Sequence, residues 1–130
     1  MLGPAMSRRV RILIGLALAG LGLVMIFSPL DVAEILDRPP ASKSAMINLR
    51  ASWGGSVLGL GAFLAWLPAL RPLGRVVLGL LGWTMAGVAL ARLTGFILDG
   101  GPDGKQWVWL TAELVIAAIC AFAVRRGRST

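Results

Sequence analysis

Four runs of apolar and small residues, separated by short polar or basic segments, take up most of this chain. They span about residues 10–28, 45–67, 73–98 and 106–124. A helix rises about 1.5 Å per residue, so each run can cross a hydrocarbon core about 30 Å thick when flanking side chains reach its edges. With 57% hydrophobic and 15% charged residues, the chain has too little polar material to cover a soluble surface. We therefore expect an all-α integral membrane protein, a four-helix bundle forming one transmembrane domain over residues 1–130.

Two features refine the first half of the chain. A basic start followed by an apolar run is shared with signal peptides, but no small-x-small cleavage site follows, so an uncleaved first helix is preferred. The next residues, Ser28-Pro29-Leu30-Asp31, resemble a helix start, with Ser as the cap and Pro in the first turn. We expect a short helix over about 29–37, lying in the membrane interface between the first two spans.

Basic residues gather at alternate ends of the runs. The arginines at one set of ends are Arg8, Arg9, Arg11, Arg71, Arg75, Arg125, Arg126 and Arg128. The opposite ends carry Asp31, Glu34, Asp37, Asp99 and Asp103, with Arg38, Lys43 and Lys105 beside them. Because cytoplasmic loops are enriched in Lys and Arg, we expect both termini in the cytoplasm. The end of the spans with the acidic residues is called the outer end below, and the other the inner end.

Three charged residues lie inside the apolar runs. Arg50, Arg92 and Glu113 fall on three different helices, each roughly 8 to 10 Å below the outer end at about 1.5 Å per residue. Charges in hydrocarbon normally pair or line a cavity. The short turn after Asp99 makes the last two helices antiparallel neighbours, so we expect Arg92 to pair with Glu113.

This polar cluster has two interpretations. In one, the Arg92–Glu113 pair only fixes helix register, and Arg50 reaches toward Asp31, Glu34 or Asp99. In the other, Arg50, Arg92, Asp99, Glu113 and Trp53 form a pocket open to the outer face, with surplus positive charge from Arg50 and the 31–37 segment as its lid. Such a pocket would suit the acidic or hydroxylated head of a lipid-like molecule. Trp53 would stack on a guanidinium, wall the pocket or simply pack in the core.

Glycines recur on the second and third helices. The positions expected to let helices approach closely are Gly54, Gly55, Gly59, Gly61, Gly87 and Gly95. Gly55 and Gly59 form a GxxxG pair. The alternative is that membrane helices simply tolerate glycine.

Several classes of chemistry have no residues to carry them. Cys120 is the single cysteine and the chain has no histidine, so we expect no disulfide, no metal site and no cofactor. The net charge of +7 sits at the ends of apolar runs and is not interleaved with stacking aromatics, so we expect no nucleic-acid partner. We expect no catalytic residue.

Three segments resemble a bacterial membrane-protein family catalogued as domain of unknown function 4345. They are Asn48-Leu-Arg-Ala-Ser-Trp-Gly-Gly-Ser-Val-Leu-Gly-Leu-Gly61, Ala91-Arg-Leu-Thr-Gly-Phe-Ile-Leu-Asp-Gly100 and Glu113. The likeness runs from about residue 10 to 124. It implies a small four-helix protein of the bacterial inner (plasma) membrane, supplies no activity, and points to Arg50, Arg92, Asp99 and Glu113.

The favoured function is non-enzymatic: an accessory subunit, or a binder of a small amphiphile through the outer polar cluster. Its partners would be the lipid bilayer, a lipid-like molecule, and a homo-oligomer or larger membrane complex. The alternative is a protomer of a small oligomeric transporter or channel, although no internal repeat or second polar cluster supports alternating access. A membrane enzyme using Glu113 as acid or base is the third choice.

Overall fold

The computed structural model describes residues 7–67 and 73–128, without the side chains of 127 and 128, and every regular element in this part of the chain is helical. The elements are α1 (Arg8–Phe27), α2 (Pro29–Leu36), α3 (Lys43–Leu49), the π-helix η1 (Arg50–Gly55), α4 (Ser56–Trp66), α5 (Leu73–Asp99) and α6 (Gly104–Arg128). The expected all-α class is confirmed. Helix α6 continues to Arg128, beyond the expected range of 106–124.

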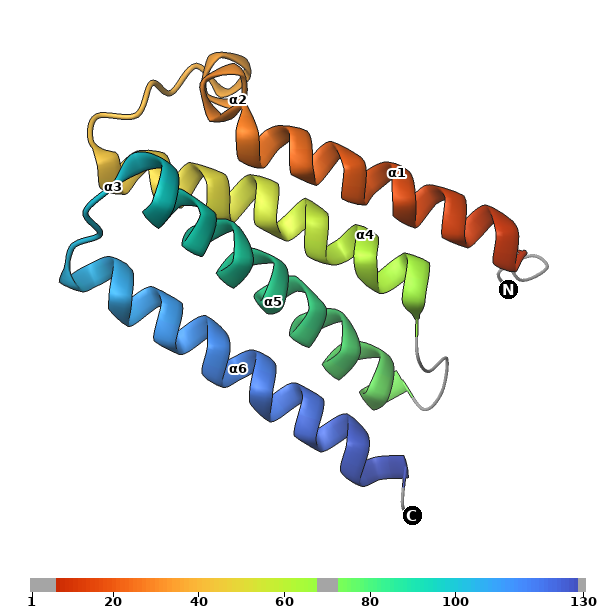
Figure 1. The fold of residues 1–130 in the computed structure, drawn as a ribbon. Helices are drawn as coiled ribbons and strands as arrows, with labels where there is room; N and C mark the ends of the chain where they lie inside the picture. Colours follow the sequence, from red (N-terminus) through yellow and green to blue (C-terminus); the bar gives the residue numbers. More distant parts are fainter. Residues whose placement is uncertain (1–6, 68–72, 129–130) are drawn as a thin grey trace.

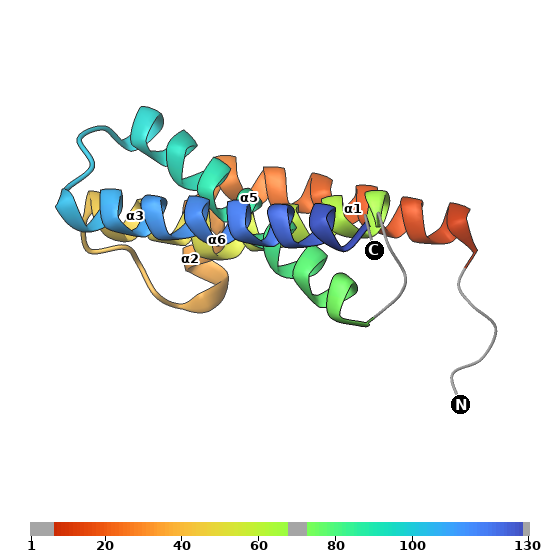
Figure 2. The same ribbon diagram turned by 90° about the horizontal axis from the view of Figure 1, so that it is seen from below.

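Four rods lie side by side in the order α1, α3–η1–α4, α5 and α6 (Figure 1). The second rod, α3–η1–α4, packs on α1 along one side and on α5 along the other, and α6 packs on α5. Helix α5 crosses the layer at an angle when the molecule is seen from below (Figure 2). The four rods that we expected to form a bundle thus lie in an open layer with α1 and α6 at its edges. Glycines lie at the interfaces between the rods, as described below.

The second rod differs from the single α-helix expected over 45–67. It contains a π-helical stretch, Arg50–Gly55, between two α-helical parts. A π-turn spaces its hydrogen bonds five residues apart, so it changes which faces the two flanking parts present. Four of the six residues of η1 are buried: Arg50, Ala51, Gly54 and Gly55.

The chain turns sharply after α1. Ser28 ends α1 by donating its backbone N–H to the carbonyl of Val24, and Pro29 begins α2. The expected Ser28 side-chain cap is absent, because Ser28 has φ −129° and ψ 57° and serves as the end of one helix and the start of the next. Helix α2 runs roughly perpendicular to α1 in both views (Figures 1 and 2).

The turn between α5 and α6 has the expected glycines in unusual conformations. Gly100 and Gly101 have φ values of +77° and +35°, which side chains with a Cβ rarely adopt. Asp103 then caps α6, since its Oδ1 accepts the backbone N–H of Gln106 at 3.0 Å. This turn folds α6 back along α5.

Glycines line the seams between the rods. Gly54 and Gly61 face α1, where a Cβ would overlap backbone atoms of Ile26 and Ala19 respectively. Gly55 and Gly59 face α5 on the other side of the same rod, and a Cβ on Gly59 would overlap the backbone of Trp83 and Thr84. These residues therefore pack within one chain.

The outside of the layer is strongly apolar. In the part of the chain that the structure describes, three helices are long and apolar enough to cross a membrane: Arg8–Phe27, Leu73–Asp99 and Gly104–Arg126, with mean hydropathies of 2.4, 1.8 and 2.1. Large apolar side chains on the two edge helices are exposed, among them Leu13, Val24, Val108, Ile119 and Phe122. This surface is that of a membrane protein, because an apolar solvent can cover it.

A glycine in a seam should be far less replaceable than one on the edge. We expect Gly59→Ala to lower stability by about 1–3 kcal/mol, since the new methyl would press on the α5 backbone. In the matched variant Gly20→Ala, the added Cβ meets nothing within 4 Å, so stability should be unchanged or raised by up to about 1 kcal/mol. Thermal unfolding of the purified protein in one detergent compares the two. Equal shifts in Tm would show that α4 and α5 do not meet at Gly59.

Candidate functional site

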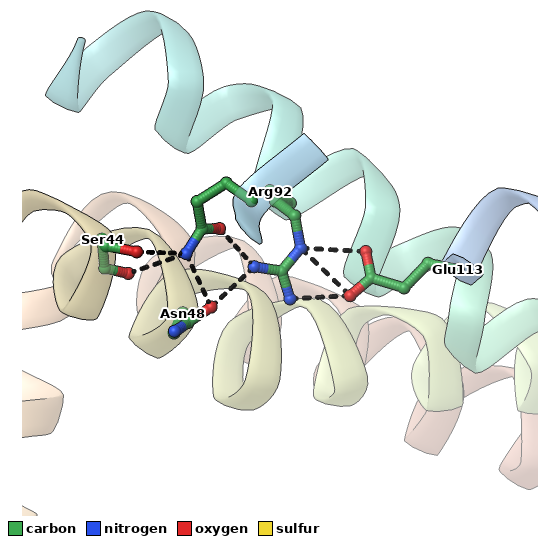
Figure 3. Close-up of polar contacts among 5 residues, drawn as sticks. Ser44, Asn48, Arg92 and Glu113 are labelled. Atoms are coloured by element: carbon green, nitrogen blue, oxygen red, sulfur yellow. Dashed lines mark hydrogen bonds and ion pairs between the residues drawn. The ribbon is translucent and has the colours of Figure 1, made fainter. Parts of the chain in front are cut away.

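Arg92 stands at the centre of a buried polar network near the outer end of the layer. Its Nη2 donates to Glu113 Oε1 at 2.6 Å, and its Nε donates to both carboxylate oxygens of Glu113 at 3.0 Å (Figure 3). The expected pair between α5 and α6 is therefore formed. Arg92 is 3% and Glu113 6% exposed, so both charges have left the solvent together.

The remaining nitrogen of Arg92 reaches two neutral side chains. Nη1 donates to Asn48 Oδ1 at 2.7 Å and to Gln106 Oε1 at 2.6 Å. Asn48 lies on α3 and Gln106 in the first turn of α6, so one guanidinium joins three elements. Every nitrogen of this side chain has an acceptor, which is what a buried arginine requires.

Gln106 extends the network toward α3. Its Nε2 donates to Ser44 Oγ at 2.6 Å, to the Ser44 carbonyl at 3.3 Å and to Asn48 Oδ1 at 3.1 Å (Figure 3). Gln106 is 1% exposed, and it is held in place by the Asp103 cap at the same helix end. The α5–α6 turn thus positions the side-chain amide of Gln106, which provides the last hydrogen-bond acceptor of Arg92.

Arg50 forms a second network on the neighbouring seam. Its Nε and Nη2 donate to Asp99 Oδ2 and Oδ1 at 2.8 and 2.9 Å, a two-point pair between η1 and the last residue of α5. Its Nη1 donates to the Ile26 carbonyl at 2.5 Å. That carbonyl lies in the last turn of α1, where helical donors run out, so Arg50 closes the end of a neighbouring helix.

The four charged residues singled out from the sequence thus meet as two separate pairs. Of the three acidic partners considered for Arg50, the structure selects Asp99. The expected surplus of positive charge from Arg50 is wrong, because Asp99 balances it. Sequence reasoning missed Asn48, Gln106 and Ser44. The signal that could have found Asn48 and Gln106 was a polar amide inside or at the start of an apolar run, at nearly the depth of Arg92.

Trp53 lines a cavity at the outer end whose lining includes neither Arg50 nor Arg92. This outer cavity has a volume of about 520 Å³ and is lined by Leu36, Arg38, Ala45, Asn48, Leu49, Ser52 and Trp53. Trp53 is 45% exposed, and among the described residues no guanidinium stacks on its ring. Residues at the end of α2 and just after it line one side of the cavity, so part of the expected lid borders it.

Asn48 connects the outer cavity to the Arg92 network. Its Oδ1 accepts from both Arg92 and Gln106, while its Nδ2 points away from the cluster (Figure 3) and donates to no described residue. The hydroxyl of Ser52 likewise makes no hydrogen bond within the described part of the chain. The polar side chains that line the cavity are thus those of Asn48, Ser52 and Arg38, beside the ring of Trp53.

Residues 7–67 and 73–128 contain no cluster of side chains that could bind a metal ion. No group of three or more His, Cys, Asp or Glu side chains there could hold a metal ion. Cys120 is buried in the inner half of α6, away from both arginine pairs.

The Arg92–Glu113 pair should behave as one energetic unit. Arg92→Gln or Glu113→Gln alone leaves a buried charge without its partner and should cost about 3–5 kcal/mol. The double variant should cost less than the sum of the two by about 0.5–3 kcal/mol. The control combines Arg92→Gln with Asp99→Asn, which belong to different pairs and should add. Unfolding free energies in detergent test this, and additivity in both cycles would contradict the pairing.

The comparisons with known proteins give one match. Comparison with curated proteins and with solved structures found no match. Residues 6–124 match the family described as Domain of unknown function (DUF4345), and this range contains both arginine pairs and the outer cavity. The chain therefore belongs to the family described as Domain of unknown function (DUF4345).

Proposed function

We propose that this protein is a four-span membrane protein of the bacterial inner membrane that binds the head group of an amphiphile in the outer cavity, without catalysing a reaction. The second rod would be the fourth span, beside the three helices that are long and apolar enough by themselves. It runs from Lys43 to Trp66 without a break between its helical segments, and it lies at the centre of the layer.

Charge at the two ends of the rods supports an N-in, C-in orientation. The N-terminus of α1, the N-terminus of α5 and the C-terminus of α6 lie at one end of the layer (Figure 1). They carry Arg8, Arg9, Arg75, Arg125 and Arg126. Arg71 and the side chain of Arg128 lie outside the described residues. By the positive-inside rule this end faces the cytoplasm.

The aromatic residues fit the same orientation. Trp107 and Trp109 are exposed at the outer end of α6, and Trp66 is exposed at the inner end of α4. Tryptophan favours the two membrane–water interfaces. Helix α2, perpendicular to α1, exposes Leu30 and Ile35 and would lie in the outer interface.

The single observation that supports a ligand is the composition of the outer cavity. It combines the side of an indole ring, an amide donor and a hydroxyl with one arginine at about the level where a lipid head group would lie. Pockets for small molecules are mostly apolar, with a few polar groups that orient the ligand. An anionic or hydroxylated head group on an acyl chain would meet all of these groups.

The buried arginines would position this cavity and would not touch the ligand. All nitrogens of Arg50 and Arg92 already have protein acceptors, so a ligand would have to displace an ion pair to reach them. Asn48 transmits the positioning, because its carbonyl oxygen is held by Arg92 and Gln106 while its amide nitrogen stays available. The protein would act as an amphiphile binder or as an accessory subunit that presents one.

Topology is tested with reporters on the full chain. Green fluorescent protein fused after Thr130 should fluoresce, and alkaline phosphatase at the same position should stay inactive, because both termini are cytoplasmic. A reporter inserted after Gly101, in the turn between α5 and α6, should give the opposite pattern. Phosphatase activity at the C-terminus would overturn the orientation.

Ligand binding is tested with lysophosphatidylglycerol, which has one acyl chain and an anionic, hydroxylated head. We expect Ser52→Leu, which fills the cavity, to weaken binding by about tenfold or more, the effect of a loss of roughly 1.4 kcal/mol. Thr111→Leu is the control, because Thr111 is an exposed small polar residue on α6 at the same end of the layer. Native mass spectrometry of the detergent-purified protein measures the bound fraction. Equal binding by the wild-type protein and both variants would reject the cavity as the site.

A further inference from the structure

A second hollow lies at the opposite end of the layer, on the face of α5 between α4 and α6. This inner groove has a volume of about 510 Å³. Its lining is Trp66, Leu78, Gly79, Gly82, Trp83, Ala86, Ala117, Ala118, Cys120, Ala121, Val124 and Arg125. The groove exists because the facing residues are small: glycine and alanine on α5 oppose alanines on α6.

From this groove we infer a second binding site, separate from the outer cavity: it holds one acyl chain of an anionic phospholipid from the inner leaflet, with the phosphate on Arg125. The lining residues of α6 run from Ala117 to Arg125, which is about 12 Å of helix at 1.5 Å per residue. One leaflet of a hydrocarbon core about 30 Å thick is about 15 Å deep. An acyl chain lying along the groove would therefore extend from the head-group level to near the middle of the bilayer.

Charge at the open end of the groove selects an anion. Arg125 lines the groove and is exposed, and no hydrogen bond or ion pair joins it to the described residues. Arg75 lies close by, because its Nη2 donates to the carbonyl of Val124 at 3.1 Å, and its Nε is buried without a hydrogen-bond partner in the described part of the chain. Arg126, whose guanidinium lies 5.8 Å from the ring centre of Phe122, adds a third cation at the same helix end.

Within residues 7–67 and 73–128, no Asp or Glu side chain lies at this end of the layer. All six acidic residues, Asp31, Glu34, Asp37, Asp99, Asp103 and Glu113, belong to the outer half of the molecule. No acidic side chain of the described residues therefore offsets the charge of Arg125. Anionic lipid head groups lie at this level and attract basic residues.

The same charges argue against a second copy of the chain in the groove. In a twofold dimer of copies with the same membrane orientation, each residue lies at the same depth as its equivalent in the other copy. Two copies joined through the groove would therefore bring both Arg125 side chains to one level of the interface, with no Asp or Glu side chain of the described residues at that level, and like charges in contact oppose association. A lipid fills the groove without this repulsion.

Cavity-filling and charge-removing variants test the site with defined lipids. The full chain is purified in detergent, stripped of lipid and titrated with palmitoyl-oleoyl phosphatidylglycerol or the phosphatidylcholine with the same chains, and native mass spectrometry counts bound lipids. On the Ser52→Leu background, in which the outer cavity is filled, the protein should retain one phosphatidylglycerol more tightly than phosphatidylcholine. Arg125→Gln should weaken the phosphatidylglycerol complex about fivefold, the effect of losing about 1 kcal/mol, and change the phosphatidylcholine complex little. Arg8→Gln removes the same charge from the same end, on α1 away from the groove, and should leave binding unchanged.

Ala121→Leu should remove the retained lipid by filling the groove, and Ala118→Leu serves if that variant does not fold. Ala112→Leu, on an exposed outer position of the same helix, is the matched control. The proposal would be overturned if the protein retained phosphatidylglycerol and phosphatidylcholine equally and Arg125→Gln changed neither. Retention unaffected by both groove variants would also overturn it, as would a dimer that these variants abolish while lipid binding persists. All of these variants carry Ser52→Leu, which fills the outer cavity, so the lipid counted is the one in the groove and the two sites can fail independently.

Discussion

A guanidinium in an apolar environment needs an acceptor for each nitrogen, and this requirement organises the outer half of the molecule. Arg92 meets it by bonding to α6 and α3 at once, and Arg50 by bonding to α1 and α5. Each side chain therefore ties together three elements that are distant in sequence. The other contacts between the rods are the packing of small residues, which has no preferred direction. These hydrogen bonds therefore define how far one rod can slide along another.

In this chain, arginines of one helix donate hydrogen bonds to carbonyls at the end of a neighbouring helix. Arg50 donates to the carbonyl of Ile26 at the end of α1, and Arg11 donates to the carbonyls of Leu64 and Ala65 at the end of α4. Arg75 donates to the carbonyl of Val124, one turn before the end of α6. The last carbonyls of a helix carry partial negative charge and lack helical donors. Where water is scarce, a cation from the adjacent helix supplies the missing bonds.

The sequence predicted the helical class, the membrane character and the Arg92–Glu113 pair, because these depend on long apolar runs and on the cost of burying a charge. It did not predict that the rods form an open layer. That outcome depends on Gly54 and Gly55 facing different neighbours, which no periodicity assigns in advance. Asn48 and Gln106 were missed because a neutral amide in an apolar run carries a weaker signal than a charge. Of the residues expected to line a pocket, only Trp53 lines the outer cavity, because Arg50, Arg92, Asp99 and Glu113 bond to one another instead.

The π-helical stretch has a consequence for the length of the second rod. A π-turn amounts to one additional residue in an α-helix, and one residue turns a helix by about 100°. The part before it directs Asn48 to the polar network, and the part after it directs Gly59 to α5 and Gly61 to α1. Removing one residue would restore a regular helix, but either the amide or the glycines would then face the wrong neighbour. The π-helical stretch therefore rotates one part of the rod relative to the other. This rotation lets the first part make its polar contacts and the second part its apolar contacts, although the two sets of contacts require different angles about the rod axis.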